Sequence, residues 1–367
     1  MSLIERNPAV IVRIWFVAVI FLYTTISFIG IEIGTSAKHT AEQLHNDRIA
    51  PDRFDTEKTQ PVVDKEKLVQ FDPVKVKSGI YIERIIDLSL PDASWVVDFY
   101  IWFHWSGTDV SPGDNFHVVD GEIIKPPELV KQTHDEDVHY ELYRVKAKMT
   151  KFFNTSRFPR DDHLLTIKIE DKKNYIYRLR YQPDSDNTTY SSRVSLHGYE
   201  IYKHRLEEKP HSYKTSRGDS NSSELNQDTY SQLIYGIWIK RPGWGNYTKM
   251  FEGLFAAVAV GMLSFFLRTT TTNRISLGVG SFFASVAANY VASRNLPNIG
   301  ILTLTDVITG LAMMTIFLVI WHTIIATRLF EIHKNDQMVH KFDMYGFVIF
   351  LTGFVASNLA LAVSASI

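Results

Sequence analysis

Five stretches of the chain are almost entirely apolar, and each is long enough to form a membrane helix. The first covers 9–33 and contains two charged residues, Arg13 and, near its end, Glu32. The other four follow one another towards the C-terminus, at 247–267, 275–292, 301–326 and 342–363. A helix needs about 20 apolar residues to cross about 30 Å of hydrocarbon, so this pattern predicts five membrane-spanning helices.

Between these stretches the apolar positions alternate with polar ones, which is typical of β-strands that bury one face. Turn-forming clusters such as Ser106-Gly107-Thr108-Asp109 separate the alternating runs. No helical period is sustained over 71–246, so the pattern predicts an all-β sandwich there. The main alternating positions are Val74, Val76, Ile80 and Ile82; Val97, Phe99, Ile101 and Phe103; Tyr143, Val145, Ala147 and Met149; Leu165, Ile167 and Ile169; and Leu233, Tyr235, Ile237 and Ile239.

The first 70 residues leave two interpretations open. Residues 1–37 are either a retained membrane anchor or a cleaved signal segment, because the small residues Ser36 and Ala37 follow the apolar run. The length of the run favours a retained anchor, since the apolar part of a signal peptide usually has only about 7–15 residues. Residues 38–70 are polar and interrupted by proline, and we predict a linker with room for one short helix.

Basic residues predict the orientation, because the cytoplasmic ends of membrane helices carry an excess of Lys and Arg. Arg6 and Arg13 place the N-terminus in the cytoplasm and the sandwich on the outer side of a cell membrane, which we expect to be a bacterial inner membrane. The short connection expected outside holds only Arg294. The two connections expected inside hold Arg268 and Arg274, and Arg328, Lys334 and Lys341.

Composition excludes several functions. The chain has 39 Lys and Arg against 40 Asp and Glu, which argues against bulk binding of nucleic acid. It has no Cys, so disulfides, thiolate metal sites and cysteine nucleophiles are excluded. HExxH, GxxxxGK and GxSxG motifs are missing, and we predict no enzyme activity, metal or cofactor. The scattered residues His104, His163, His204 and His211 are interpreted as surface or packing residues.

Residues 150–169 have the sequence TKFFNTSRFPRDDHLLTIKI. The unit Phe158-Pro159-Arg160-Asp161 resembles the FPxD core of the signature loop of pentameric ligand-gated ion channels, the Cys-loop receptor superfamily. The resemblance is to the prokaryotic branch in particular, whose members lack the Cys pair of this loop.

Other segments agree with this resemblance. Residues 76–105 look like the first two strands of the family, although the WxD unit expected after them reads Trp105-Ser106-Gly107. Lys240-Arg241-Pro242 is similar to the basic residue and proline before the first channel helix. Asn295-Leu296-Pro297, followed by Asp306, resembles the linker that couples receptor domain and pore. The resemblance implies an extracellular all-β sandwich followed by an all-α four-helix transmembrane channel domain (247–367), with an additional N-terminal transmembrane helix.

The resemblance also implies a function. The chain would be one subunit of a homopentameric channel that opens when a small-molecule ligand or a proton binds the sandwich. Polar residues 214–229 resemble the family's capping loop over the ligand site. An alternative is a membrane-anchored receptor that does not conduct, although 328–341 leaves little room for a signalling module. The residues implied for gating are Phe158, Pro159, Asp161, Arg241, Pro297 and Asp306, and those implied for ligand binding are Tyr100, Tyr175, Tyr177, Tyr213 and Tyr230.

The second channel helix carries a stripe of mostly small or polar residues at spacings of three and four. Such a stripe suits either a water-filled pore or close helix packing, and the resemblance favours the pore. Phe283 is its bulkiest apolar residue and is predicted to form the gate. The stripe contains Ser276, Gly280, Phe283, Ala287, Tyr290 and Arg294, and we assign Leu277, Val279, Phe282 and Val286 to the opposite face.

Selectivity is predicted from the inner end of this helix, where no acidic residue occurs over 268–274. Asn273 and Arg274 would lie at the inner mouth, which predicts anion preference or poor discrimination. If Arg274 points into the protein, only Thr and Asn side chains remain at the mouth and selectivity would be weak. His322, near the inner end of the third channel helix, is interpreted as an interfacial residue and not as a proton sensor.

Overall fold

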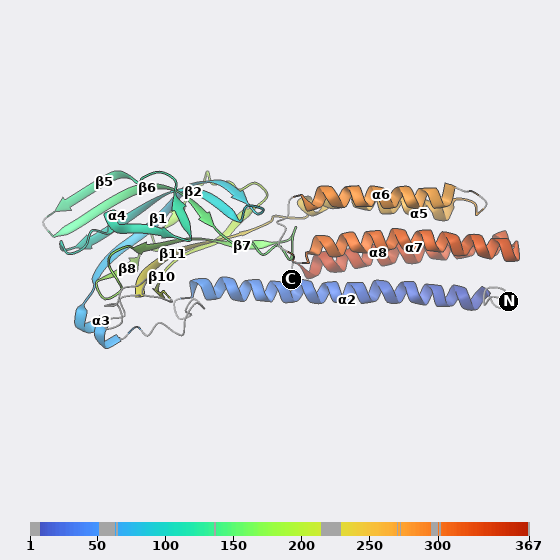
Figure 1. The fold of residues 1–367 in the computed structure, drawn as a ribbon, viewed down its shortest axis with the longest axis horizontal. Coiled ribbons are helices and arrows are strands. Elements are labelled where there is room, and N and C mark those ends of the chain that lie inside the picture. The colour runs from blue at the N-terminus through green and yellow to red at the C-terminus, as the bar shows by residue number, and fades with distance from the viewer. Residues whose placement is uncertain are drawn as a thin grey trace. The chain divides into compact units, whose positions relative to one another are not determined.

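The computed structural model describes residues 8–50, 63, 65–135, 137–213, 229–269, 271, 273–294, 300 and 302–365. The chain forms two compact units (Figure 1). The helical unit contains Met1–Thr40, Asn154–Asp161 and Gly243–Ile367, and the β unit contains Ala41–Phe153 and Asp162–Pro242.

The β unit has two sheets, which confirms the predicted β-rich region. The larger sheet has the strand order β4-β6-β2-β1-β8, with β5 paired to β6 and β9 paired to β1. The smaller sheet has the order β10-β11-β7-β3. The strands are β1 (Val74–Ser89), β2 (Ser94–Ser106), β3 (Phe116–Val119), β4 (Gly121–Ile123), β5 (Glu128–Asp135), β6 (Val138–Thr150), β7 (Asp162–Asp171), β8 (Leu179–Pro183), β9 (Thr189–Tyr190), β10 (Glu200–Ser212) and β11 (Thr229–Lys240).

Strand β11 shows how these strands are covered. Its alternate residues Leu233, Tyr235, Ile237 and Ile239 are fully buried, as the two-residue period predicts. The residues between them are buried as well, so both faces of the strand are covered. Part of this second face contacts the end of a helix, because Trp238 clusters with Leu164 of β7 and with Ile49.

That helix, α2, is the main departure from the predicted boundaries. It runs from Pro8 to Ile49 without interruption and therefore includes residues 38–49, the first part of the segment predicted as a linker (Figure 1). Its 42 residues span about 63 Å at 1.5 Å per residue, about twice what a bilayer core requires. Two short helices, α3 (Lys65–Phe71) and α4 (Pro112–Asn115), also belong to the β unit.

The end of α2 is anchored on the smaller sheet of the β unit. Ala41, His45 and Ile49 recur every four residues and are all buried. Gly236 of β11 provides the space, because a Cβ atom there would collide with the Ile49 side chain. His45 Nδ1 lies 3.9 Å from Asp162 Oδ2 beside this contact.

The helical unit contains four further long helices. They are α5 (Gly245–Met262), which continues as the 3-10 helix η1 (Leu263–Phe266), α6 (Asn273–Ser293), α7 (Leu304–His333) and α8 (Asp336–Ser364). With α2, they are five helices long and apolar enough to cross a membrane, as predicted. The ends of these helices differ from the ends of the apolar stretches. The difference arises because polar capping residues, such as Thr303 for α7 and Asn335 for α8, set where a helix begins.

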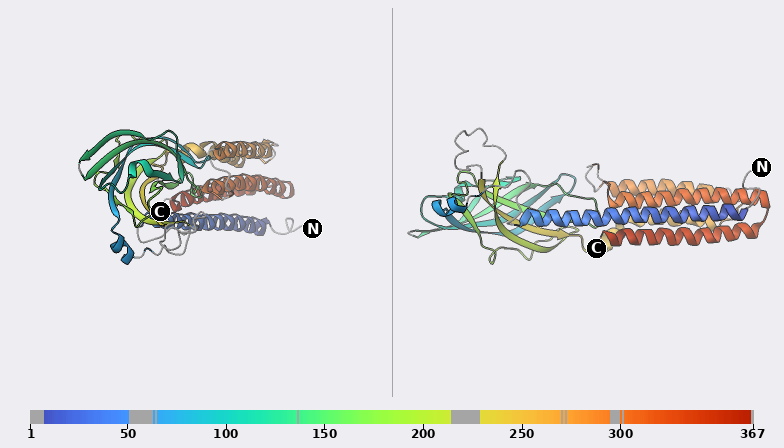
Figure 2. Two further views of the ribbon diagram at one scale, coloured as in Figure 1. Left: turned by 60° about the vertical axis from the view of Figure 1, so that its left-hand side comes forward. Right: turned by 90° about the horizontal axis from the view of Figure 1, so that it is seen from below.

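The first part of α2 lies alongside α7 and α8 (Figure 2). Tyr23 Oη lies 2.8 Å from Thr315 Oγ1 of α7, and Ser27 Oγ donates to Ser357 Oγ of α8 at 2.7 Å. Gly353 permits the approach, since a Cβ there would lie 2.7 Å from the Tyr23 ring. Interhelical hydrogen bonds are typical of helices that pack together in a membrane, and so are glycines at the points of contact.

The anchored end of α2 gives a stability prediction. We expect Ile49→Ala to lower the local stability of β7 and β11 by about 2–5 kcal/mol, because it leaves a cavity against Trp238 and Leu164. Hydrogen exchange of the full-length protein measures this as faster exchange in those two strands. Leu44→Ala is the matched control, because Leu44 lies on the same part of α2 and is 48% exposed. Equal protection in wild type and Ile49→Ala would contradict the packing role.

Candidate functional site

One face of helix α6 is not covered by the described residues of the chain. All six residues of the predicted stripe lie on that face: Ser276, Gly280, Phe283, Ala287, Tyr290 and Arg294. Phe283 and Tyr290 are each 68% exposed. The buried residues of α6 are Arg274, Gly278, Ser281, Ser285 and Ala292. At about 100° per residue, the stripe points about 180° away from this buried face.

The structure corrects the face predicted to lie opposite the stripe. Val279, Phe282 and Val286 are exposed, and Leu277 is only half-buried. Small residues make the real packing face, because they let neighbouring helices approach closely. Gly278 faces Ile320 of α7, and Ser281 lies 3.4 Å from a Cβ built on Gly261 of α5.

The Arg274 side chain points into the protein, which is the orientation for which the sequence predicts weak selectivity. Its side chain is 1% exposed. Its Nη2 donates to Asp343 Oδ1 of α8 at 2.8 Å, and its Nε donates to the carbonyl oxygen of Ser264 at 2.9 Å. A guanidinium held by these partners cannot contribute a charge to the exposed face, which leaves Asn273 exposed at this end of α6.

The loop Asn154–Asp161, which contains the FPxD sequence, groups with the helical unit although it connects strands β6 and β7. The Leu304 N–H donates to the Ser156 carbonyl at 2.8 Å, and Thr305 Oγ1 donates to the Phe158 carbonyl at 3.0 Å. Both donors lie at the start of α7, and the Leu304 N–H is one of the backbone groups that lack a partner inside the helix. Phe158 and Pro159 are buried, and the peptide bond between them is cis.

Two arginines of the loop extend these contacts to other helices. Arg157 Nη1 donates to the Ala365 carbonyl at the end of α8, at 3.4 Å. Arg160 Nη1 donates to the Gly243 carbonyl at 2.9 Å, and its guanidinium lies 4.5 Å from the centre of the Trp244 ring, just before α5. Sequence reasoning missed both arginines, because only the FPxD positions matched a known pattern.

The other predicted gating residues are not brought into one described cluster. Asp306 closes a capping box at the start of α7, since its Oδ2 accepts from Thr303 N at 2.8 Å and from Thr303 Oγ1 at 2.7 Å. Asp161 is buried in the helical unit, whereas Arg241 belongs to the β unit and donates to Tyr199 Oη at 2.8 Å. The predicted contact between Asp161 and Arg241 stays a prediction, and Pro297 lies outside the described residues.

No protein-family model matches this sequence, and no curated protein matches it either.

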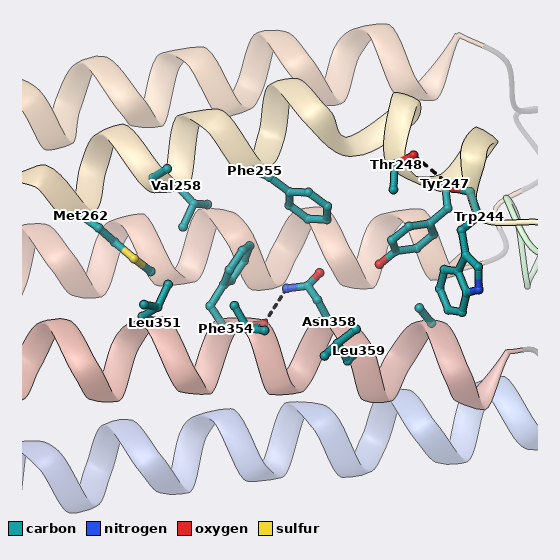
Figure 3. Close-up of a pocket in the computed structure, with 13 residues that line it drawn as sticks. Trp244, Tyr247, Thr248, Phe255, Val258, Met262, Leu351, Phe354, Asn358 and Leu359 are labelled. Atoms are coloured by element: carbon teal, nitrogen blue, oxygen red, sulfur yellow. Dashed lines mark hydrogen bonds between the residues drawn. The ribbon is translucent and has the colours of Figure 1, made fainter.

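A groove of about 410 Å³ lies between α5 and α8 (Figure 3). Apolar side chains, including Phe255, Met262 and Phe354, form most of its wall. Asn358 also lines the groove, but its Nδ2 donates to the Phe354 carbonyl of its own helix at 2.8 Å. A groove of this composition suits a hydrocarbon chain better than a charged ligand.

Two of the predicted ligand-binding tyrosines form part of a buried polar cluster in the β unit. The rings of Tyr213 and Tyr230 meet edge to face, with centroids 5.7 Å apart. Beneath them Glu170 of β7 is fully buried and accepts three hydrogen bonds. The donors are His211 Nδ1 at 2.6 Å, Tyr213 Oη at 2.7 Å and Gln232 Nε2 at 2.6 Å. The capping loop predicted over these tyrosines lies outside the described residues, apart from Thr229.

Glu170 was not predicted from sequence, because one acidic residue near a strand end is common. Burial raises the pKa of this carboxyl, but hydrogen bonds from His211, Tyr213 and Gln232 and the charge of His211 outweigh burial and hold its pKa below the usual value. Glu170 is therefore the ionised centre of the cluster at neutral pH.

Tyr100 lies on a different sheet from this cluster. It is half-buried on β2, on the face opposite the buried residues Phe99 and Ile101. The Arg144 guanidinium lies 5.7 Å from the centre of its ring. Asp98 fixes this arginine by accepting from Arg144 Nη2 at 2.9 Å and from Arg84 Nε at 3.1 Å.

Tyr175 and Tyr177 line a separate cavity of about 460 Å³, together with Phe71, Asp109 and Arg178. Tyr177 is 5% exposed, and its ring lies 6.1 Å from that of Phe71. The predicted ligand-binding tyrosines therefore occupy three places in the chain: the Glu170 cluster, the outer face of β2 and this cavity. Among the described residues, no group of three or more His, Asp or Glu side chains could hold a metal ion.

The Glu170 cluster predicts a pH dependence. The pKa of Glu170 in the folded protein is lower than the pKa of an unfolded glutamate, which is about 4.3. The ionised carboxylate therefore contributes its full stability above about pH 4.3. This contribution is lost as the pH falls through the lower pKa of the folded state. We expect Glu170→Gln to cost about 1–3 kcal/mol near pH 7 and to remove this acid-dependent loss. Hydrogen-exchange protection of β10 and β11, followed from about pH 7 to pH 3, measures both. A wild-type protection that does not change with acid would contradict the assignment.

Proposed function

We propose that this chain is a subunit of a ligand-gated ion channel of the pentameric, Cys-loop receptor type. One observation carries the proposal: residues 154–161, which connect two strands of the β unit, are hydrogen-bonded to residues at the start of α7, before α5 and at the end of α8. A displacement of those strands would pull directly on the ends of three helices. This is what coupling between a binding domain and a pore requires.

The uncovered face of α6 supports the pore. A residue such as Phe283, 68% exposed on a helix able to cross a membrane, must contact lipid, water or another subunit. Ser276, Gly280 and Arg294 on the same stripe suit water better than lipid, because polar groups are costly in hydrocarbon. One such helix cannot enclose water, whereas a symmetric ring of copies can, so the proposed assembly is a homopentamer.

The placement of the tyrosines suits a ligand site between subunits. Tyr213 and Tyr230 lie over the smaller sheet, whereas Tyr100 lies on the outer face of the larger one. In a ring, the Tyr213 face of one sandwich would meet the Tyr100 face of the next. Aromatic groups on both sides suit an amine, bound by cation–π contacts of about 0.5–2 kcal/mol.

The proposed topology has five spans in a cell membrane, with the N-terminus in the cytoplasm and the β unit outside. The contacts of α2 with α7 and α8 favour a retained helix over a cleaved signal segment. Tyr23 and Val19 belong to the same buried cluster as Phe251, Ile308 and Phe350. Removal of α2 would expose this apolar surface and the Thr315 hydroxyl.

Reconstitution into liposomes tests the proposal. Agonist screening across pH and amines should reveal an ion flux, and the reversal potential in a salt gradient should lie away from the cation equilibrium value, because Arg294 is the charged group on the stripe. We expect Phe283→Ser to leak without agonist, since it removes the apolar constriction. Phe282→Ser is the matched control, because Phe282 lies off the stripe and is 36% exposed. A silent wild type, or equal leakage in both variants, would refute the pore assignment.

The loop contact with α7 gives a separate prediction. Thr305→Val removes the hydroxyl that donates to the Phe158 carbonyl, and we expect about a tenfold loss of agonist sensitivity, the equivalent of a hydrogen bond worth about 1.4 kcal/mol. Thr309→Val is the control, because the Thr309 hydroxyl, one turn further along α7, has no hydrogen-bond partner among the described residues. Dose–response curves of flux measure both variants. Wild-type sensitivity in Thr305→Val would count against coupling through this bond.

A further inference from the structure

A cluster of buried polar side chains connects α2, α6, α7 and α8 of the helical unit. It reaches α5 only through η1, the 3-10 helix that continues α5. Its centre is His322 of α7, which is 0% exposed and therefore not the interfacial residue predicted from sequence. Trp15 of α2 and Asp343 of α8 lie on either side of the imidazole, and Arg274 of α6 binds the far side of Asp343. Arg274 in turn donates to the Ser264 carbonyl in η1.

The hydrogen bonds determine the protonation state of His322. Trp15 Nε1 donates to His322 Nδ1 at 3.1 Å, and an indole N–H can only donate. Nδ1 must therefore be unprotonated, and the proton of the neutral ring is on Nε2. His322 Nε2 lies 3.3 Å from Asp343 Oδ1 but is not aligned with it as a hydrogen bond.

The surroundings hold the imidazole in this place. The ring stacks on Phe342 with centroids 4.0 Å apart and an interplanar angle of 10°, and Phe265 meets its other side edge-on at 4.9 Å. Gly346 lets α8 approach, since a Cβ there would lie 2.9 Å from His322 Nε2. The described charged groups around the ring are Asp343 and, behind it, Arg274. From α2 and η1 it meets only aromatic side chains: Trp15, Phe16 and Phe265.

A cavity of about 400 Å³ gives access to this cluster from the ends of α5 and α8. Asp343 lines it, together with Arg268, Asp336 and His340. The side chains of Arg268 and Asp336 make the cavity suitable for water, which can carry a proton to Asp343 and on to His322.

A second proton on His322 would change both of its contacts. Nδ1–H would face the Trp15 N–H, and two donors cannot form a hydrogen bond. The imidazolium would also compete with Arg274 for the single carboxylate of Asp343, since two positive charges would then be buried beside one negative charge. Protonation therefore weakens the attachment of α2 to α7.

We propose that His322 is a proton-binding site, reached through the cavity at Asp343, whose protonation releases the Trp15 end of α2 from the other helices. Neutral His322 holds α2 against α7 through Trp15. Acid on the side where the cavity opens breaks this contact. The release itself does not depend on the proposed channel function; only its effect on ion flux would rest on that function.

Spin-label distances in the full-length protein test the release. The chain has no Cys, so Val17→Cys on α2 and Tyr345→Cys on α8 can be labelled specifically. Both side chains are exposed, at 66% and 63%. In lipid nanodiscs we expect one narrow distance distribution at about pH 7.5 and a broader, longer one at about pH 4.5, below the usual range of histidine.

Three variants in the labelled background separate the site from other effects of acid. His322→Asn retains an acceptor for Trp15 but cannot titrate, so the narrow distribution should persist at both pH values. Trp15→Phe removes the donor, so the broad distribution should occur at both. His39→Asn removes an exposed histidine of α2 that does not line the cavity, and it should behave as the unsubstituted chain does. A distance that is unchanged by acid, or that changes equally in His322→Asn, would overturn the proposal.

Hydrogen exchange on the unlabelled protein provides a second measurement. Acid should lower the protection of α2 around Trp15, relative to the intrinsic rate, in the wild type and not in His322→Asn. The spectroscopic and exchange results stand whether or not ions flow. If no ions flow in liposomes but the spin-label distance depends on pH, the channel is refuted and the proton site stands. If ions flow but the distance does not change with pH, the proton site is refuted and the channel stands.

Discussion

The ion pair between Arg274 and Asp343 is the interaction on which the arrangement of the helical unit depends. Both side chains are almost completely buried among helices that are long and apolar enough to cross a membrane. Leaving either charge alone in such surroundings would cost about 3–5 kcal/mol, so the start of α6 and the start of α8 must stay together. The pair also turns α6, because Arg274 at its first turn fixes which face of the helix is covered.

That orientation determines what remains exposed. With Arg274, Gly278, Ser281 and Ser285 turned inward, the face that contains Phe283 and Tyr290 can only point away from the other helices. The same small side chains allow α5 and α7 to lie close to α6. One buried charge pair and a row of small residues thus account for both the packing of α6 and the surface that we assign to the pore.

Helix α2 connects the two units by covalent continuity. Its first part is held in the helical unit by Trp15, Tyr23 and Ser27, and its last turns are held in the β unit by Ile49. Because α2 is unbroken between these attachments, it joins the two units independently of the loop at 154–161. The chain also passes between the two units at three other places, after Phe153, Asp161 and Pro242.

The sequence alone determined the elements and their kinds. Apolar runs of about 20 residues and two-residue alternation are local properties, and they predicted the five long helices and the strands β1, β2, β6, β7 and β11 correctly. The FPxD motif also marked the loop that contacts α7. Tertiary structure decided three features that local patterns do not contain. The packing of the end of α2 at Ile49 depends on the space left by Gly236, and the inward direction of Arg274 depends on Asp343 far along the chain. The third feature is the burial of His322 and Glu170. The physical reason is that a polar side chain is stable in a buried place only when its partners are there, and those partners come from elements distant in sequence.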